Sequence, residues 1–137
     1  MGMLFDFAVS GVPRAHSSRS RGTWQAKVRA AAGAAWPVSR AVLEQEIAVL
    51  VVYFYRGATA LDVDNMAKPI LDSLSGIVYR DDGLISQLLV RKTELHEGLE
   101  IRDPTPALAE AVAGSSESGR DFVYVRIDSA PDHGGIP

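Results

Sequence analysis

The sequence predicts a single α+β domain, in which helices pack on a mixed, mostly antiparallel sheet. Strand-like and helix-like segments alternate irregularly along the chain, and no internal repeat is present. A length of 137 residues suits one domain and allows roughly two-thirds of the unfolded surface to be buried. We expect this domain to cover residues 1–128 and a disordered, Pro- and Gly-containing tail to cover residues 129–137.

The strands are predicted from β-branched and aromatic runs that end at turn-forming residues. The segment EIAVLVVYFY (residues 46–55) is apolar almost throughout, so we expect it to be a central strand that is buried on both faces. A first strand is bounded by Gly11-Val12-Pro13, and a hairpin is expected to turn near Glu97-Gly98. The full set of predicted strands is 3–10, 46–55, 85–93, 99–102 and 122–127.

Two helices are predicted in the first half of the chain. The first begins after a mobile loop at residues 17–22, with Thr23 as its N-cap, and ends near Ala35, before Trp36-Pro37. The second covers residues 65–75 and ends at Gly76. Its apolar side chains form one stripe, made of Met66, Ile70, Leu71 and Leu74. A third, short helix is expected at residues 106–113, followed by a flexible connector at 114–119.

Composition excludes several classes of site. The chain contains no Cys, so disulfides, thiolate metal sites and cysteine nucleophiles are excluded, and any metal must be bound by oxygen or imidazole. Neither an apolar run of membrane-spanning length nor a basic-then-apolar signal peptide is present, so we expect a cytoplasmic protein.

The charge distribution indicates a surface that contacts phosphates. Residues 1–43 contain six basic residues and one acidic residue, whereas residues 44–137 contain eight basic and sixteen acidic residues. A basic N-terminal third beside an acidic remainder favours a DNA partner. The predicted DNA-binding residues are Arg14, Arg19, Arg21, Lys27 and Arg29. A solvated basic helix without a partner is the alternative.

Acidic residues between positions 62 and 82 form a candidate metal site. In an extended segment Asp62 and Asp64 would point to the same side and could share one cation. Asp82 follows after a predicted helix and a turn at residues 76–80, so the chain must turn back to bring the third carboxylate near. Oxygen donors with positions left open for water and phosphate suit Mg²⁺.

Ordinary structural roles remain open for the same residues. Asp64 could cap the helix that follows it, and Asp64, Lys68 and Asp72 are spaced as a surface row of ion pairs. The segment Asp81-Asp82-Gly83 could be a simple turn. A calcium loop counted from Asp62 is excluded, because Ala67 occupies its glycine position and Ser73 its final glutamate position.

The segment LDVDNMAKPILDSLSGIVYRDDGLI resembles the signature of the RusA-like Holliday-junction resolvases, or crossover junction endodeoxyribonucleases. The opening Phe7-x-Val9-x-Gly11-x-Pro13 is also similar to the family's first strand and turn, and the resemblance covers most of residues 5–103. The signature elements in this chain are Asp62, Asp64, Asn65, Lys68, Asp72, Leu74, Gly76, Asp81, Asp82 and Ile85.

The resemblance implies magnesium-dependent cleavage of four-way DNA junctions by a homodimer in DNA recombination and repair, with Mn²⁺ as a substitute for Mg²⁺. It assigns the metal to Asp62, Asp64 and Asp82, with Asp81 as the alternative third ligand, and places Lys68 near the scissile phosphate. These three aspartates and Lys68 are therefore the expected catalytic residues. The loop before Asp62 contains one basic residue, Arg56, where some relatives carry several arginines. A RusA-like DNA-binding module with weak or no nuclease activity is the second hypothesis.

Overall fold

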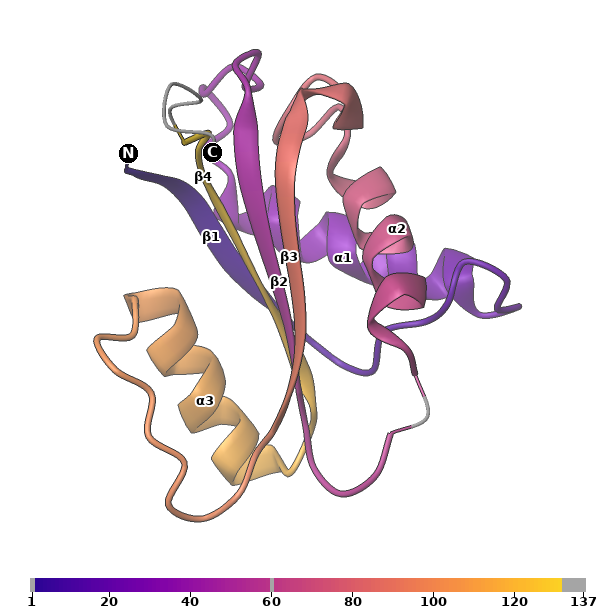
Figure 1. Cartoon of the computed structure of the whole chain (residues 1–137), viewed down its shortest axis with the longest axis vertical. Helices are drawn as coiled ribbons and strands as arrows, with labels where there is room; N and C mark the ends of the chain where they lie inside the picture. Colours follow the sequence, from indigo (N-terminus) through magenta and orange to yellow (C-terminus); the bar gives the residue numbers. More distant parts are fainter. Residues whose placement is uncertain (1, 60, 132–137) are drawn as a thin grey trace, which may run out of the picture.

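Four strands form one mixed sheet, with helices on both of its faces (Figure 1). The structure, a computed structural model, describes residues 2–59 and 61–131. The strands are β1 (Met3–Ser10), β2 (Ile47–Tyr55), β3 (Ile85–Glu94) and β4 (Phe122–Ser129), in the order β1-β4-β2-β3. β4 runs antiparallel to β1 and β2, whereas β3 runs parallel to β2. The predicted α+β class with a mixed sheet is confirmed.

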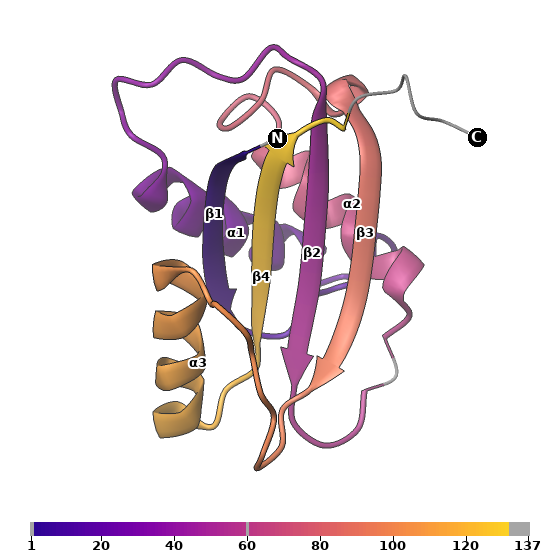
Figure 2. The ribbon, with the colours of Figure 1, turned by 60° about the vertical axis from the view of Figure 1, so that its left-hand side comes forward.

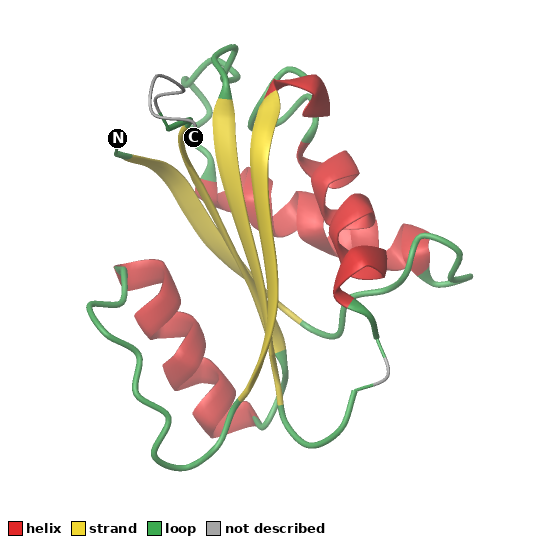
Figure 3. Cartoon of the chain, in the orientation of Figure 1, coloured by secondary structure: helices red, strands yellow, loops and turns green. Residues whose placement is uncertain are grey.

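The helices are distributed unequally over the two faces of the sheet. Helices α1 (Arg21–Ala35) and α2 (Val63–Leu74) lie together on one face, and α3 (Pro106–Ser118) lies on the other (Figure 3). In Figure 2, α3 lies over the β1 side of the sheet and leaves much of β2 and β3 uncovered. Most of the predicted C-terminal tail, residues 132–137, lies outside the described residues.

The central strand β2 is buried on both faces, as predicted. Its residues Val51 and Tyr53 belong to the main core, which packs against α1 and α2. Val52 and Phe54 belong to a smaller cluster under α3. Because successive side chains of a strand point to opposite faces, one apolar run serves both cores.

Helix α1 begins earlier than expected. Its N-cap is Ser20, and the Trp24 amide donates to the Ser20 carbonyl at 3.1 Å, so the assignment of Thr23 as N-cap is wrong. Arg21 and Gly22 are therefore helical and not part of a loop. The Ser20 side chain makes no capping hydrogen bond, so the capping preference of residue types did not mark the start of this helix. The predicted end before Trp36-Pro37 is confirmed.

The predicted hairpin is absent. Residues 99–102 form no strand, and β3 pairs in parallel with β2. A turn does occur near Gly98, where the Leu99 amide donates to the His96 carbonyl at 3.1 Å. After it the chain crosses to α3, and Ile101 packs against the smaller core cluster. Packing of one side chain against that cluster replaces strand pairing here.

Helix α3 is longer than predicted, and the proposed flexible connector at residues 114–119 is wrong. The helix continues to Ser118 and ends at Gly119, which adopts the left-handed conformation with φ of 73°. Ser115 is buried within it, and its hydroxyl donates to the Arg120 carbonyl at 2.6 Å. Small polar residues are compatible with a helix when tertiary contacts satisfy them.

Candidate active site

Helix α2 begins at Val63, two residues earlier than predicted, and this changes the relation between the first two aspartates. Asp62 is the N-cap residue, although its side chain makes no capping hydrogen bond, and Asp64 lies in the first helical turn. The two residues therefore do not alternate along an extended segment, and the argument that they share a side is wrong. The alternative that Asp64 is the N-cap is wrong too. An acidic residue in the first turn is favourable beside the positive end of the helix dipole.

The buried face of α2 fixes the exposed face that carries the polar residues. The predicted apolar stripe is confirmed, since its four members Met66, Ile70, Leu71 and Leu74 are all buried. Pro69 lies inside the helix, and its carbonyl accepts hydrogen bonds from the Gln25 side chain at 3.1 Å and from the Ser73 hydroxyl at 2.6 Å. The first of these bonds attaches α2 to α1. Asp64, Lys68 and Asp72, four residues apart, are left along one face.

A turn at residues 76–80 brings Asp82 back to α2. Gly76 adopts φ of 86°, and its amide donates to the Tyr79 carbonyl at 2.8 Å. Tyr79 is fully buried, and its hydroxyl donates to the Leu71 carbonyl at 2.6 Å. Burial raises the pKa of Tyr79 well above its ordinary value, so the hydroxyl stays a donor. The predicted reversal of the chain therefore depends on a tyrosine anchored under the helix.

The reversal creates a hollow of about 220 Å³ between α2, β3 and the turn before β3. Its lining residues are Asp64, Ala67, Lys68, Leu71, Asp72, Asp82 and Leu88. Two of the three predicted metal ligands, together with the predicted catalytic lysine, thus line one hollow. Asp62 is not among the lining residues.

Lys68 neutralises part of the negative charge in this acidic hollow. Its ammonium lies 3.0 Å from Asp72 Oδ1 and 3.9 Å from Asp82 Oδ2. The hydrogen bond to Asp72, with a smaller contribution from Asp82, raises the pKa of Lys68 above its ordinary value. The ammonium is therefore charged at neutral pH. The predicted ion pair between Lys68 and Asp72 is present. Asp72 also lines the hollow, although it was not among the predicted site residues.

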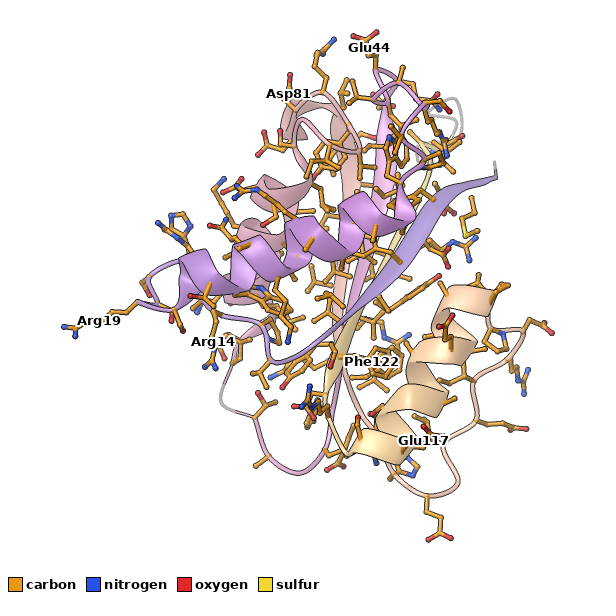
Figure 4. All side chains as sticks on the ribbon, turned by 180° about the vertical axis from the view of Figure 1, so that it is seen from behind. Arg14, Arg19, Glu44, Asp81, Glu117 and Phe122 are labelled. Carbon is orange, nitrogen blue, oxygen red and sulfur yellow. The ribbon has the colours of Figure 1, made fainter. Side chains whose placement is uncertain are left out.

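Asp81 and Asp82 have different surroundings. The Asp81 carboxylate accepts a hydrogen bond from the Gly83 amide at 2.8 Å and another from Arg80 Nε at 3.1 Å. These bonds, the one from Arg80 first, lower the pKa of Asp81. Asp81 thus caps the short 3-10 helix Asp82–Leu84 at the end of the molecule where β3 begins (Figure 4). Asp82 lines the hollow.

The donor chemistry of the hollow suits a hard divalent cation, but the ligands are not gathered. Asp64, Asp72 and Asp82 offer carboxylate oxygens beside open solvent. Over residues 2–59 and 61–131, however, no three His, Asp or Glu side chains lie close enough together to hold one metal ion. The chemistry of these oxygen donors therefore agrees with Mg²⁺, although the described residues do not gather three of them around one point.

Two of the five predicted DNA-binding residues share a hollow, and the other three lie outside its lining. Arg14 and Lys27 line a hollow of about 190 Å³ near the start of α1, with Ser20 and Thr23. Arg19 extends away from the molecule near Arg14 (Figure 4). Arg21 donates to the His16 carbonyl at 2.8 Å, which orders the turn before the helix, and Arg29 is exposed further along α1.

No described helix is long and apolar enough to cross a membrane.

Comparison with known families identifies one match. The family model described as Endodeoxyribonuclease RusA matches residues 7–102. That range contains the second half of β1 and all of α1, β2, α2 and β3, and it includes every residue of the acidic hollow. No curated protein matches the chain.

Proposed function

Because the chain belongs to the RusA family of endodeoxyribonucleases, we propose that it cleaves four-way DNA junctions by magnesium-dependent hydrolysis, as a homodimer in recombination and repair. The observation that carries this proposal is the placement of Asp64, Lys68 and Asp82 around one hollow at the surface. Carboxylates in such a position can bind a cation that neutralises a phosphodiester. The ammonium can contact the negatively charged phosphate oxygens directly.

Asp62, Asp64 and Asp82 are the proposed ligands of the cation. A bound Mg²⁺, or Mn²⁺ in its place, would activate water and neutralise charge on the phosphate. The carboxylates would hold the cation, and without it they would repel phosphate. Asp62 must move toward the hollow for this, and its position at the N-cap without a capping hydrogen bond leaves its side chain free to do so.

Lys68 is proposed to act on the phosphate directly. It is exposed over more than half of its side chain and is held between Asp72 and Asp82. A compact, mobile charge suits a phosphate oxygen. The ammonium would stabilise the charge that builds in the transition state.

A DNA-binding module without cleavage remains the second candidate, and the lack of three gathered carboxylates in the described residues favours it. Incubation of a labelled four-way junction with the protein, with Mg²⁺ and with a chelator, separates the two. Cleavage only with Mg²⁺ supports the nuclease. Binding without cleavage at any Mg²⁺ or Mn²⁺ concentration supports the module.

Substitution of the adjacent aspartates is expected to separate their roles. Asp82→Asn should reduce the cleavage rate by roughly a hundredfold or more, because it removes a carboxylate from the hollow. Asp81→Asn should retain cleavage within a few-fold, because its side chain faces Arg80 and Gly83. Single-turnover rates of the two variants provide the test. A loss confined to Asp81→Asn would assign the third ligand to Asp81.

The basic residues before and within α1 are expected to contact phosphates. Replacing Arg19 and Arg21 by Ala should weaken binding to all DNA sequences and reduce the slope of log affinity against log salt by about one unit per residue. Arg102→Ala, a change of the same kind at an exposed position beyond β3, is the control. An unchanged salt slope in the double variant would support a solvated surface without a DNA partner.

A further inference from the structure

Lys92 of β3 lies on the face of the sheet that α1 and α2 cover. It pairs with Tyr53 of β2, and Val90, two residues earlier in β3, pairs with Val51. Tyr53 and Val51 belong to the main core, and Val90 packs against it. Because paired residues of neighbouring strands point to the same face, Lys92 points to this face too. Figure 2 shows that the chain that leaves β2 passes beside the end of β3 before α2 begins.

The Lys92 ammonium is attached to the residue that precedes Asp62. Its Nζ donates to the Leu61 carbonyl at 2.9 Å. The Leu61 amide donates to the Thr59 hydroxyl at 3.2 Å, so side chains bind both backbone polar groups of Leu61. The Leu61 side chain itself packs against the main core. The peptide bond that joins Leu61 to Asp62 is therefore fixed by a side chain of β3.

An ion pair does not explain this lysine. The Lys92 side chain is half-buried, and among residues 2–59 and 61–131 no carboxylate lies within ion-pair distance of its ammonium. The Leu61 carbonyl is its hydrogen-bond partner there. A charged donor makes a hydrogen bond roughly twice as strong as a neutral donor does, so the contact holds this one carbonyl firmly.

Asp62 consequently has a fixed backbone and a free side chain. Its carbonyl accepts a hydrogen bond from the Asn65 amide at 3.1 Å, and the carbonyl before it is held by Lys92. Its side chain makes no capping hydrogen bond. A ligand on an anchored backbone can turn toward a cation by rotation about its own side-chain bonds. It then loses less conformational freedom than a ligand on a loose loop.

We propose that Lys92 is a positioning residue for Asp62, and thereby sets the affinity of the site for its divalent cation. Lys92 acts through the Leu61 carbonyl and touches neither the cation nor the phosphate. The inference rests on the proposed function, because Asp62 is a proposed ligand of the cation. Without the ammonium, Asp62 would sample several positions and would bind the cation more weakly.

The direction of the change in metal affinity separates positioning from other roles of a lysine. An ammonium near a cation repels it, so removal of the charge alone would strengthen binding of a divalent cation. Removal of a group that fixes Asp62 weakens that binding instead. A lysine that only contacts DNA would change DNA affinity and leave metal binding in the absence of DNA unaltered.

Binding of Mn²⁺ to the whole chain without DNA, followed by electron paramagnetic resonance of the free ion, is the test. Lys92→Met keeps most of the apolar stem and removes the charge. The dissociation constant of Mn²⁺ should rise about tenfold or more, as it does when other partners of metal ligands are lost. Lys92→Arg retains a charged donor and should stay within a few-fold of the wild type.

Arg91→Met is the matched control, because it removes one charge from the next residue of β3. Arg91 is exposed and pairs with Val52, which belongs to the smaller cluster on the opposite face. This variant should bind Mn²⁺ as the wild type does. If thermal melting shows that Lys92→Met does not fold, Lys92→Gln replaces it with the same expectations.

A double-mutant cycle shows whether Lys92 acts through Asp62. In the Asp62→Asn background, Lys92→Met should change the dissociation constant of Mn²⁺ little, because the ligand that Lys92 positions is already lost. An equal effect in both backgrounds would overturn the proposal. So would a Lys92→Met variant that binds Mn²⁺ as tightly as the wild type, or more tightly.

Failure of this inference is distinguishable from failure of the proposed function. Mn²⁺ binding that weakens in Lys92→Met, without junction cleavage by the wild type at any Mg²⁺ concentration, would support the inference and refute the nuclease. Magnesium-dependent cleavage together with unchanged Mn²⁺ binding by Lys92→Met would refute the inference alone. A wild-type chain that binds no Mn²⁺ would also refute it, whatever the cleavage assay shows.

Discussion

Replacing Asp64 by Asn is expected to abolish DNA cleavage, a loss of about a thousandfold or more, while junction binding persists or improves. The change removes a negative charge that the proposed cation needs and that repels phosphate when no cation is bound. Asp64 lies in the first turn of α2 and lines the acidic hollow, so the isosteric amide should leave the fold intact.

Single-turnover cleavage at saturating Mg²⁺ and a binding assay in chelator measure the two effects. Asp103→Asn is a matched control, because it makes the same chemical change away from the hollow, at a φ of 46° that Asn tolerates. Full activity of Asp64→Asn at saturating Mg²⁺ would remove Asp64 from the site.

Lys68→Ala is expected to reduce the single-turnover cleavage rate by roughly a hundredfold or more, with thermal stability and junction affinity nearly unchanged. A positioned charge that stabilises the transition state typically has an effect of this size. The lysine is 57% exposed, and its ion pairs with Asp72 and Asp82 are open to solvent, so their loss should affect folding little.

Asp72→Asn distinguishes the two possible roles of Lys68. It removes the shorter ion pair but leaves the ammonium in place, so the cleavage rate should fall less than in Lys68→Ala. If Lys68→Ala lowers the melting temperature while the rate per folded molecule is unchanged, Lys68 is a salt-bridge residue and its catalytic role is wrong.

Elements with a strong local signal were predictable from the sequence. β2 is such an element, because a long β-branched and aromatic run has no stable alternative to a strand that is buried on both faces. The apolar stripe of α2 likewise follows from its spacing. The start of α2 was not predictable to the residue, since Asp62 and Asp64 are both good N-caps and tertiary contacts decide between them.

Features that depend on distant contacts were not predictable. The segment 99–102 has a strand-like pattern, but the edge of β3 that it would join remains unpaired in the described chain. The acidic hollow combines Asp72 of α2 with Leu88 of β3, and the buried Tyr79 between them in the sequence donates its hydroxyl to the Leu71 carbonyl. No local pattern contains that contact. The distinction between Asp81 and Asp82 requires the hydrogen bonds of the 3-10 turn.

The most direct test of the account is one gel assay that compares a four-way junction, a replication fork and plain duplex DNA. With Mg²⁺ the wild-type chain should make paired, symmetrically placed nicks in the junction and leave the duplex intact. Chelator and the Asp64→Asn variant should both prevent the nicks. Equal cleavage of all three substrates, or cleavage that persists in Asp64→Asn, would contradict the claim that the acidic hollow is the active site of a junction-selective nuclease.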